Sequence, residues 1–212
     1  MKTLSLNFIF ILFFSFSLFS QSPPQGTVRL KSSQAGIKYI DVNEITIQSW
    51  REFLYWTLQE YGRESAEYKA LLPDSTIIQK IMPNWNHPSF SYYPIVGISY
   101  KQAMEYCAWR SLRINEYLKS KKKKYTISFS LPAKTDFEDA YKQQKYKTSQ
   151  KKLTPIEYNN KKLVNIADNA HEITSDSTVL ERDLSGKLQF QPYQGPSAIM
   201  GFRCVAKVVK IK

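Results

Sequence analysis

The chain has only two cysteines, and both follow an N-terminus of the kind that directs export. Cys107 lies in the segment Tyr106-Cys107-Ala108-Trp109 and Cys204 in Gly201–Val205, so each has the aromatic and apolar neighbours typical of a core. An isolated pair of cysteines persists as a disulfide in an oxidising compartment, whereas cytosolic thiols normally stay reduced. We expect one Cys107–Cys204 bond, which would tie the middle of the chain to its end. The alternative is two free buried thiols that act as small hydrophobes.

The N-terminus has the layout of a signal peptide. Lys2 precedes an apolar run over residues 4–19, and the run stops at Ser20-Gln21-Ser22-Pro23-Pro24. We predict a signal peptide over residues 1–20 and one domain over residues 21–212. The exported protein would be periplasmic, on the outer surface or secreted. An uncleaved membrane anchor is the alternative, whereas a lipid-modified N-terminus is not expected because no cysteine follows the run.

Charge narrows the possible partners. The formal net charge is +12, and loss of Lys2 with the signal leaves about +11, concentrated in residues 119–124 and 142–162. A nucleic-acid role is not expected, because it would need stacking aromatic residues interleaved with the lysines in a groove. An anionic glycan or a peripheral membrane contact fits the charge better, and an ordinary solvated basic exterior is the simplest interpretation.

Apolar periodicity predicts an α+β fold with few helices and short antiparallel strands. Residues 27–41 alternate like a hairpin with a turn at Gln34-Ala35-Gly36. A helix is expected from an N-cap at Thr46 to Gly62, and a longer one from Ser99, where Ser99 and Gln102 form a capping box, through Leu118. Further expected elements are a strand over 125–130, a helix opened by a capping box of Thr135 and Glu138, and β segments at 189–191 and 202–209.

Between Glu64 and Pro94 the periodicity fails, and we expect an irregular loop packed on the body of the domain. Exposed aromatic side chains offer a large contact area at a small entropic cost, so the loop is a candidate partner surface. Alternatively, its aromatic residues simply cover the core. The candidate residues are Trp85, His87, Phe90, Tyr92 and Tyr93.

Several passages, in order, resemble the formylglycine-generating enzyme, or sulfatase-modifying factor, family. They are Asn43–Thr46, Pro94–Trp109, Leu131-Pro132 with Phe137-Glu138, Asn165–Asp176 and Gly201–Val205. The segment Trp109–Glu116 is more similar to the branch found in gliding-motility and type IX secretion lipoproteins. The resemblance implies an irregular fold related to C-type lectins, and it implies the same Cys107–Cys204 bond.

Asn165–Glu172 resembles a calcium-binding turn of that family. By this resemblance, Ca²⁺ would be held by the side chains of Asn165 and Glu172 and by the carbonyl groups of Asp168 and Ala170, which are hard oxygen donors. Asp168 stands where the family motif has a glycine, and aspartate tolerates the left-handed conformation that such a turn needs. The alternative is that Asn165 and Glu172 only satisfy backbone groups of an ordered loop.

Catalysis is not expected. Enzymes of the family are expected to use two neighbouring thiols and a copper ion, placed between the asparagine-glutamate turn and the C-terminal Gly-Phe-Arg motif, but Ser177–Met200 contains no cysteine. Copper would require Cys107 and Cys204 to be free and adjacent. An iron site is not expected either, because His87 and His171 are the only histidines and no spaced carboxylate accompanies them.

The sequence therefore predicts an exported, non-catalytic domain that binds or scaffolds an envelope protein, linked to gliding motility or secretion. One alternative is an enzyme of unrecognised chemistry in a remnant cleft around Glu172, Arg182 and Arg203. Converging polar groups with a strongly shifted carboxylate pKa would favour it, and a cleft filled by Phe190 and Tyr193 would count against it. Another alternative is a carbohydrate-binding module.

Overall fold

The computed structural model describes residues 23–31, 37–144, 153–157, 162–183 and 185–211. The predicted signal peptide, residues 1–20, and the predicted hairpin turn, residues 34–36, lie outside these ranges, so both stay predictions. Within the described ranges, no helix combines the length and the apolar character needed to cross a membrane.

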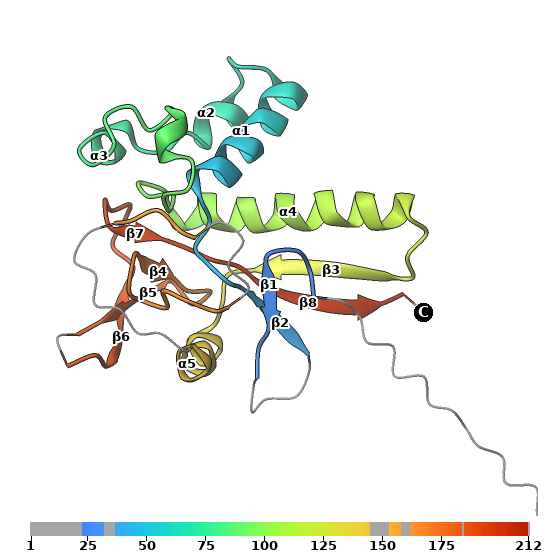
Figure 1. Cartoon of the computed structure of the whole chain (residues 1–212). Coiled ribbons are helices and arrows are strands. Elements are labelled where there is room, and N and C mark those ends of the chain that lie inside the picture. Colours follow the sequence, from blue (N-terminus) through green and yellow to red (C-terminus); the bar gives the residue numbers. More distant parts are fainter. Residues whose placement is uncertain (1–22, 32–36, 145–152, 158–161, 184, 212) are drawn as a thin grey trace, which may run out of the picture.

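Two four-stranded sheets form the framework (Figure 1). The first is antiparallel in the order β1-β2-β8-β3, with strands Thr27–Arg29, Lys38–Asp41, Val205–Lys210 and Tyr125–Ser130. The second has the order β6-β5-β4-β7, with strands Leu188–Pro192, Thr178–Arg182, His171–Ile173 and Met200–Gly201, and only β4 and β7 pair in parallel. The α+β class and the hairpin pairing of β1 with β2 are confirmed.

The two predicted long helices are confirmed. Helix α1 (Ile47–Tyr61) begins at Thr46, whose side chain accepts from Ser49 N, and ends at Gly62. Helix α4 (Tyr100–Ser120) begins with the Ser99–Gln102 capping box and lies along the first sheet (Figure 1). Its side chains satisfy the open edge of β3: Asn115 Oδ1 accepts from Ile127 N at 2.8 Å, and Asn115 Nδ2 donates to Ile127 O at 2.8 Å. This capping protects the edge from pairing with another chain.

Two sequence expectations were wrong in detail. The helix predicted to open with Thr135 and Glu138 is α5 (Lys134–Gln143), which begins earlier because buried Asp136 accepts from Ala133 N at 3.1 Å. The segment expected to be irregular contains short helices whose first turns are capped by Ser65, Asp74 and His87. These are α2 (Ala66–Ala70), α3 (Ser75–Ile78) and the 3₁₀ helix η1 (Pro88–Phe90).

The main core lies where α1 and α4 meet the extended segment between β7 and β8. Trp50 is fully buried; its ring stacks on Tyr106 at 5.8 Å and meets Phe202 edge-on at 6.1 Å. Along Gly201–Cys204, successive side chains alternate in direction because the backbone is extended. Phe202 and Cys204 therefore enter this core, while Arg203 faces the ionic cluster on the other side.

Candidate functional site

The structure brings the two cysteines together. Cys107 projects from α4, Cys204 lies at the start of β8, and their Sγ atoms are 3.4 Å apart, with both residues buried and both thiols free. Burial raises the pKa of the Cys204 thiol well above its ordinary value, so this group is a poor source of thiolate. The expected proximity is present, and the covalent bond itself stays a prediction.

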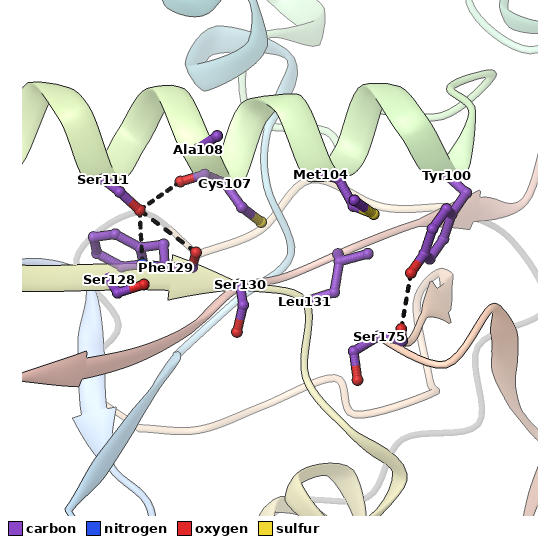
Figure 2. Close-up of a pocket in the computed structure, with 10 residues that line it drawn as sticks. All are labelled: Tyr100, Met104, Cys107, Ala108, Ser111, Ser128, Phe129, Ser130, Leu131 and Ser175. Atoms are coloured by element: carbon purple, nitrogen blue, oxygen red, sulfur yellow. Dashed lines mark hydrogen bonds between the residues drawn. The ribbon is translucent and has the colours of Figure 1, made fainter.

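A groove of about 580 Å³ runs between α4 and β3, and Cys107 forms part of its wall (Figure 2). Cys204 does not line it. Two hydrogen bonds fix the walls: Phe129 N donates to Ser111 Oγ at 2.8 Å, and Tyr100 Oη donates to Ser175 O at 2.8 Å. Its lining combines apolar side chains with four serines. Its lining residues are Tyr100, Met104, Cys107, Ala108, Ser111, Ser128, Phe129, Ser130, Leu131 and Ser175.

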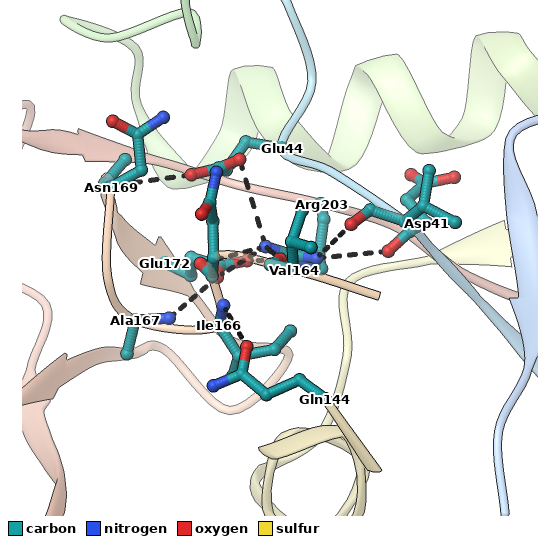
Figure 3. Close-up of polar contacts among 12 residues, drawn as sticks. Asp41, Glu44, Gln144, Val164, Ile166, Ala167, Asn169, Glu172 and Arg203 are labelled. Atoms are coloured by element: carbon teal, nitrogen blue, oxygen red, sulfur yellow. Dashed lines mark hydrogen bonds and ion pairs between the residues drawn. The ribbon is translucent and has the colours of Figure 1, made fainter. Parts of the chain in front are cut away.

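Arg203 is the centre of a second, wholly buried cluster (Figure 3). Its Nε donates to Glu172 Oε2 at 2.5 Å and its Nη2 donates to Glu172 Oε1 at 3.0 Å, which is a bidentate ion pair. The remaining donors reach backbone carbonyl groups at 3.1–3.3 Å, so the guanidinium is fully satisfied. The carbonyl groups belong to Asp41, Val42, Val164 and Asn165.

A second buried carboxylate faces the same guanidinium. Glu44 Oε2 lies 4.0 Å from Arg203 Nη2 and has no hydrogen-bond partner among the described residues, while Glu44 Oε1 accepts from Ala170 N at 3.3 Å. Burial raises the pKa of Glu44 to about 7 against the opposing effect of Arg203, and burial also raises the pKa of Glu172. The Arg203 guanidinium is therefore the cation that faces both the Glu172 and the Glu44 carboxyl groups. No local pattern in the sequence predicts this arrangement, because Glu44 lies 126 residues from Ala170.

The turn that resembles a calcium site surrounds Arg203 instead. Both oxygens of Glu172 are engaged, by Arg203 and by Ala167 N, and the Asn165 carbonyl accepts from Arg203 at 3.2 Å. The left-handed residues are Asn165 and Ala167, with φ of 57° and 58°, and Asp168 is not among them. Asp168 instead forms an ion pair with Arg182 at 2.5 Å. Because a guanidinium already neutralises the carboxylate, this donor set does not fit Ca²⁺ as arranged here.

Removing Ca²⁺ with a chelator tests whether the turn around Glu172 binds this ion. We expect the melting temperature of the purified chain to be the same in excess EDTA and in excess Ca²⁺, because Arg203 already supplies the positive charge that the turn needs. Thermal unfolding followed by circular dichroism in both buffers measures this. A rise in melting temperature that depends on Ca²⁺ and disappears in a Glu172→Gln variant would restore the calcium interpretation.

The titration of Glu44 predicts an unusual pH dependence. Its pKa is raised from 4.5 to about 7, so the folded state holds this proton more tightly than the unfolded state does. The free energy of unfolding should therefore fall as pH rises from about 5 to about 7. Urea unfolding at a series of pH values, in EDTA, measures the slope, and Glu44→Gln should flatten it. The exposed Glu52→Gln variant is the control, and an unchanged slope in Glu44→Gln would contradict the prediction.

The alternative catalytic cleft around Glu172, Arg182 and Arg203 is not an open cleft in this structure. Glu172 and Arg203 are both 0% exposed, although raised carboxyl pKa values are present. Phe190 packs partly buried against the smaller core and Tyr193 against the main core. No cluster of three or more histidine, cysteine, aspartate or glutamate residues suited to a metal ion occurs within the described ranges.

Most of the aromatic side chains in the loop between Glu64 and Pro94 pack against the core. Trp85, Phe90 and Tyr93 pack against it, as the alternative interpretation expected. His87 is exposed and accepts from Ser89 N at 3.2 Å, while Tyr92 is 39% exposed. Two of the five candidate residues therefore face solvent.

A more exposed aromatic surface lies on α1, and sequence reasoning missed it. Tyr55 and Tyr61 are 55% and 51% exposed, and Trp56 is 38% exposed with the guanidinium of Arg113 3.8 Å from its ring centre. Helical spacing could have found Tyr55 and Trp56, because these two positions fall off the apolar stripe of Trp50, Phe53 and Leu54, whereas Tyr61 follows that stripe and is exposed as the last residue of the helix. We call Tyr55 and Trp56, whose ring centres are 5.9 Å apart, the α1 aromatic face.

Comparison with known proteins identifies the domain. The profile of one family, described as the sulfatase-modifying factor enzyme 1-like domain (FGE-sulfatase), matches residues 23–184, which is more than half of the chain. No curated protein matches the sequence. The match covers Asn43–Thr46, Pro94–Trp109 and Asn165–Asp176, which carried the resemblance in the sequence. The chain therefore belongs to the sulfatase-modifying factor enzyme 1-like domain family.

Proposed function

We propose that this chain is an exported, non-catalytic member of its family that binds or scaffolds another protein in the cell envelope. One observation carries the proposal: the only two thiols of the chain face each other in the interior, 3.4 Å apart. A pair placed in this way is suited to a structural disulfide, which would leave no thiol for the oxidation of a substrate cysteine. The similarity of Trp109–Glu116 to the gliding-motility and secretion branch favours a partner in one of those machines. We also propose that the fold is related to that of C-type lectins.

The α1 aromatic face is the surface that supports a binding role best. It presents a tyrosine and a tryptophan at neighbouring positions on the solvent side of α1, and such residues dominate the energetics of protein interfaces. Tyr92 and His87 add to the exposed aromatic area from the loop.

Two measurements test the proposal. Oxidation of a cysteine-containing peptide in the presence of copper and oxygen should not exceed that of a Cys107→Ala/Cys204→Ala variant. The chain should also capture a specific partner from an envelope extract, and Tyr55→Ser/Trp56→Ser should lose that partner. A matched control is Leu72→Ser/Leu112→Ser, which removes exposed apolar residues elsewhere. Peptide oxidation that requires Cys107, without any captured partner, would overturn the proposal.

A second candidate is thiol chemistry in the groove between α4 and β3. It is favoured by Cys107, which lines this groove with Cys204 directly behind it. The family chemistry needs neighbouring free thiols, and these two would be adjacent if reduced. The raised pKa of Cys204 counts against it, because copper binds thiolates. Stoichiometric Cu(I) binding by the reduced chain that is lost in Cys107→Ala would support this candidate.

A carbohydrate-binding role has a separate test. It follows from the expected kinship with lectins and from the basic charge of the chain. Binding on a glycan array that disappears in EDTA would support it. The arrangement around Glu172 gives no basis for that chelator effect, since Arg203 occupies the carboxylate.

A further inference from the structure

One end of the domain gathers lysines from two distant parts of the chain. Lys119 and Lys121–Lys124 follow the last turns of α4, and all five are exposed. The end of β8 lies beside them, because Tyr125 pairs with Lys210 and Ile211 N donates to Lys124 O at 3.1 Å. Figure 1 shows α4, β3 and β8 meeting at this end. We call Lys119, Lys121–Lys124 and Lys210 the basic end.

The charge of the basic end is not neutralised locally. Within the described ranges, none of its lysines takes part in an ion pair, and Glu116, the acidic residue of the last two turns of α4, pairs with Arg113. The helix dipole favours a cation in the last turn, which accounts for Lys119 but not for lysines beyond the helix. The backbone of Lys122 is left-handed, with φ of 52°, a conformation in which glycine or asparagine is favoured. The position nevertheless carries a lysine.

Apolar side chains are interleaved with these lysines. Tyr117 is 57% exposed, and Val209 and Ile211 are each 55% exposed. A polyanion such as a polysaccharide needs only the charges, whereas a bilayer with anionic headgroups uses both the charges and apolar groups that enter the boundary between headgroups and acyl chains. The mixture therefore favours a lipid surface.

We propose that the basic end binds the surface of a bilayer that carries anionic headgroups. The lysines contact the headgroup phosphates, and Tyr117 and Ile211 insert at the interface. This surface is separate from the α1 aromatic face, and the inference does not rest on the proposed partner-binding role. An anionic membrane could then hold the domain at a fixed orientation.

Vesicle binding by the full chain tests the proposal. The chain should bind phosphatidylcholine vesicles that contain phosphatidylglycerol, bind neutral vesicles far less, and dissociate as salt rises. Lys121→Glu/Lys122→Glu/Lys123→Glu should weaken binding at least about tenfold. The control is Lys31→Glu/Lys80→Glu/Lys187→Glu, which makes the same charge change at exposed sites elsewhere and should keep most of the binding.

Hydrogen–deuterium exchange on the vesicle-bound chain locates the contact, and it distinguishes binding by the basic end from binding by the N-terminal residues. Protection should appear at residues 115–124 and 205–211. Tyr117→Ser/Ile211→Ser should weaken binding to the vesicles while leaving binding to heparin, a soluble polyanion, unchanged. No protection at these residues would overturn the proposal. So would equal vesicle binding by the two triple-lysine variants, or vesicle binding that does not respond to Tyr117→Ser/Ile211→Ser.

Discussion

Replacing Arg203 with methionine is expected to lower the free energy of unfolding by about 3 to 5 kcal/mol. The variant leaves Glu172 buried with no cation, and it also removes the guanidinium that lies 4.0 Å from Oε2 of Glu44. It also removes the donors to four backbone carbonyl groups that hold the turn after residue 163 against β2. Urea unfolding followed by tryptophan fluorescence measures the loss, with the exposed Arg63→Met as control.

A partial rescue separates charge from packing. If the uncompensated carboxylate causes most of the loss, then Arg203→Met/Glu172→Leu should be more stable than Arg203→Met alone, because replacing both partners of a buried ion pair costs less than removing one. The double variant also keeps the test informative if Arg203→Met fails to fold. Equal instability of the single and double variants would show that the backbone contacts of Arg203, rather than its charge, stabilise the fold.

The sequence predicted the elements whose signals are local. The capping box at Ser99, the stripe that includes Trp50 in α1 and the alternation over 125–130 each lie within one element, and each was confirmed. The caps of α2 and α3, Ser65 and Asp74, were also visible in the sequence. They were missed because helices this short bury too little apolar surface to create a periodic pattern.

The cluster around Arg203 could not be predicted in the same way. Its members come from the segment after β2, the turn before β4 and the segment before β8, and no local pattern links them. The resemblance points to the turn before β4 and predicts a metal ion there, since a motif records which oxygens point inward and not which cation they surround. The turn carbonyls accept hydrogen bonds from a guanidinium in this chain.

The second large effect concerns the two sulfur atoms. Chain that has been exported to an oxidising compartment should contain the Cys107–Cys204 bond, and unreduced, denatured protein should show no alkylatable thiol by mass spectrometry. The sulfurs are already in contact, so closing the bond requires only a small approach. Reduction should then destabilise the fold by about 4 to 5 kcal/mol, because the bond constrains a long loop of the unfolded chain.

The double variant Cys107→Ala/Cys204→Ala shows whether that loss comes from the bond. Its free energy of unfolding should equal that of the reduced wild type, apart from the small loss caused by removing two buried sulfur atoms. Adding reductant should leave that free energy unchanged. Two alkylatable thiols in unreduced protein, with a melting temperature that reductant leaves unchanged, would contradict the prediction. The pair would then be a free dithiol with one member on the wall of the α4–β3 groove, and the proposal of a non-catalytic domain would lose the observation that carries it.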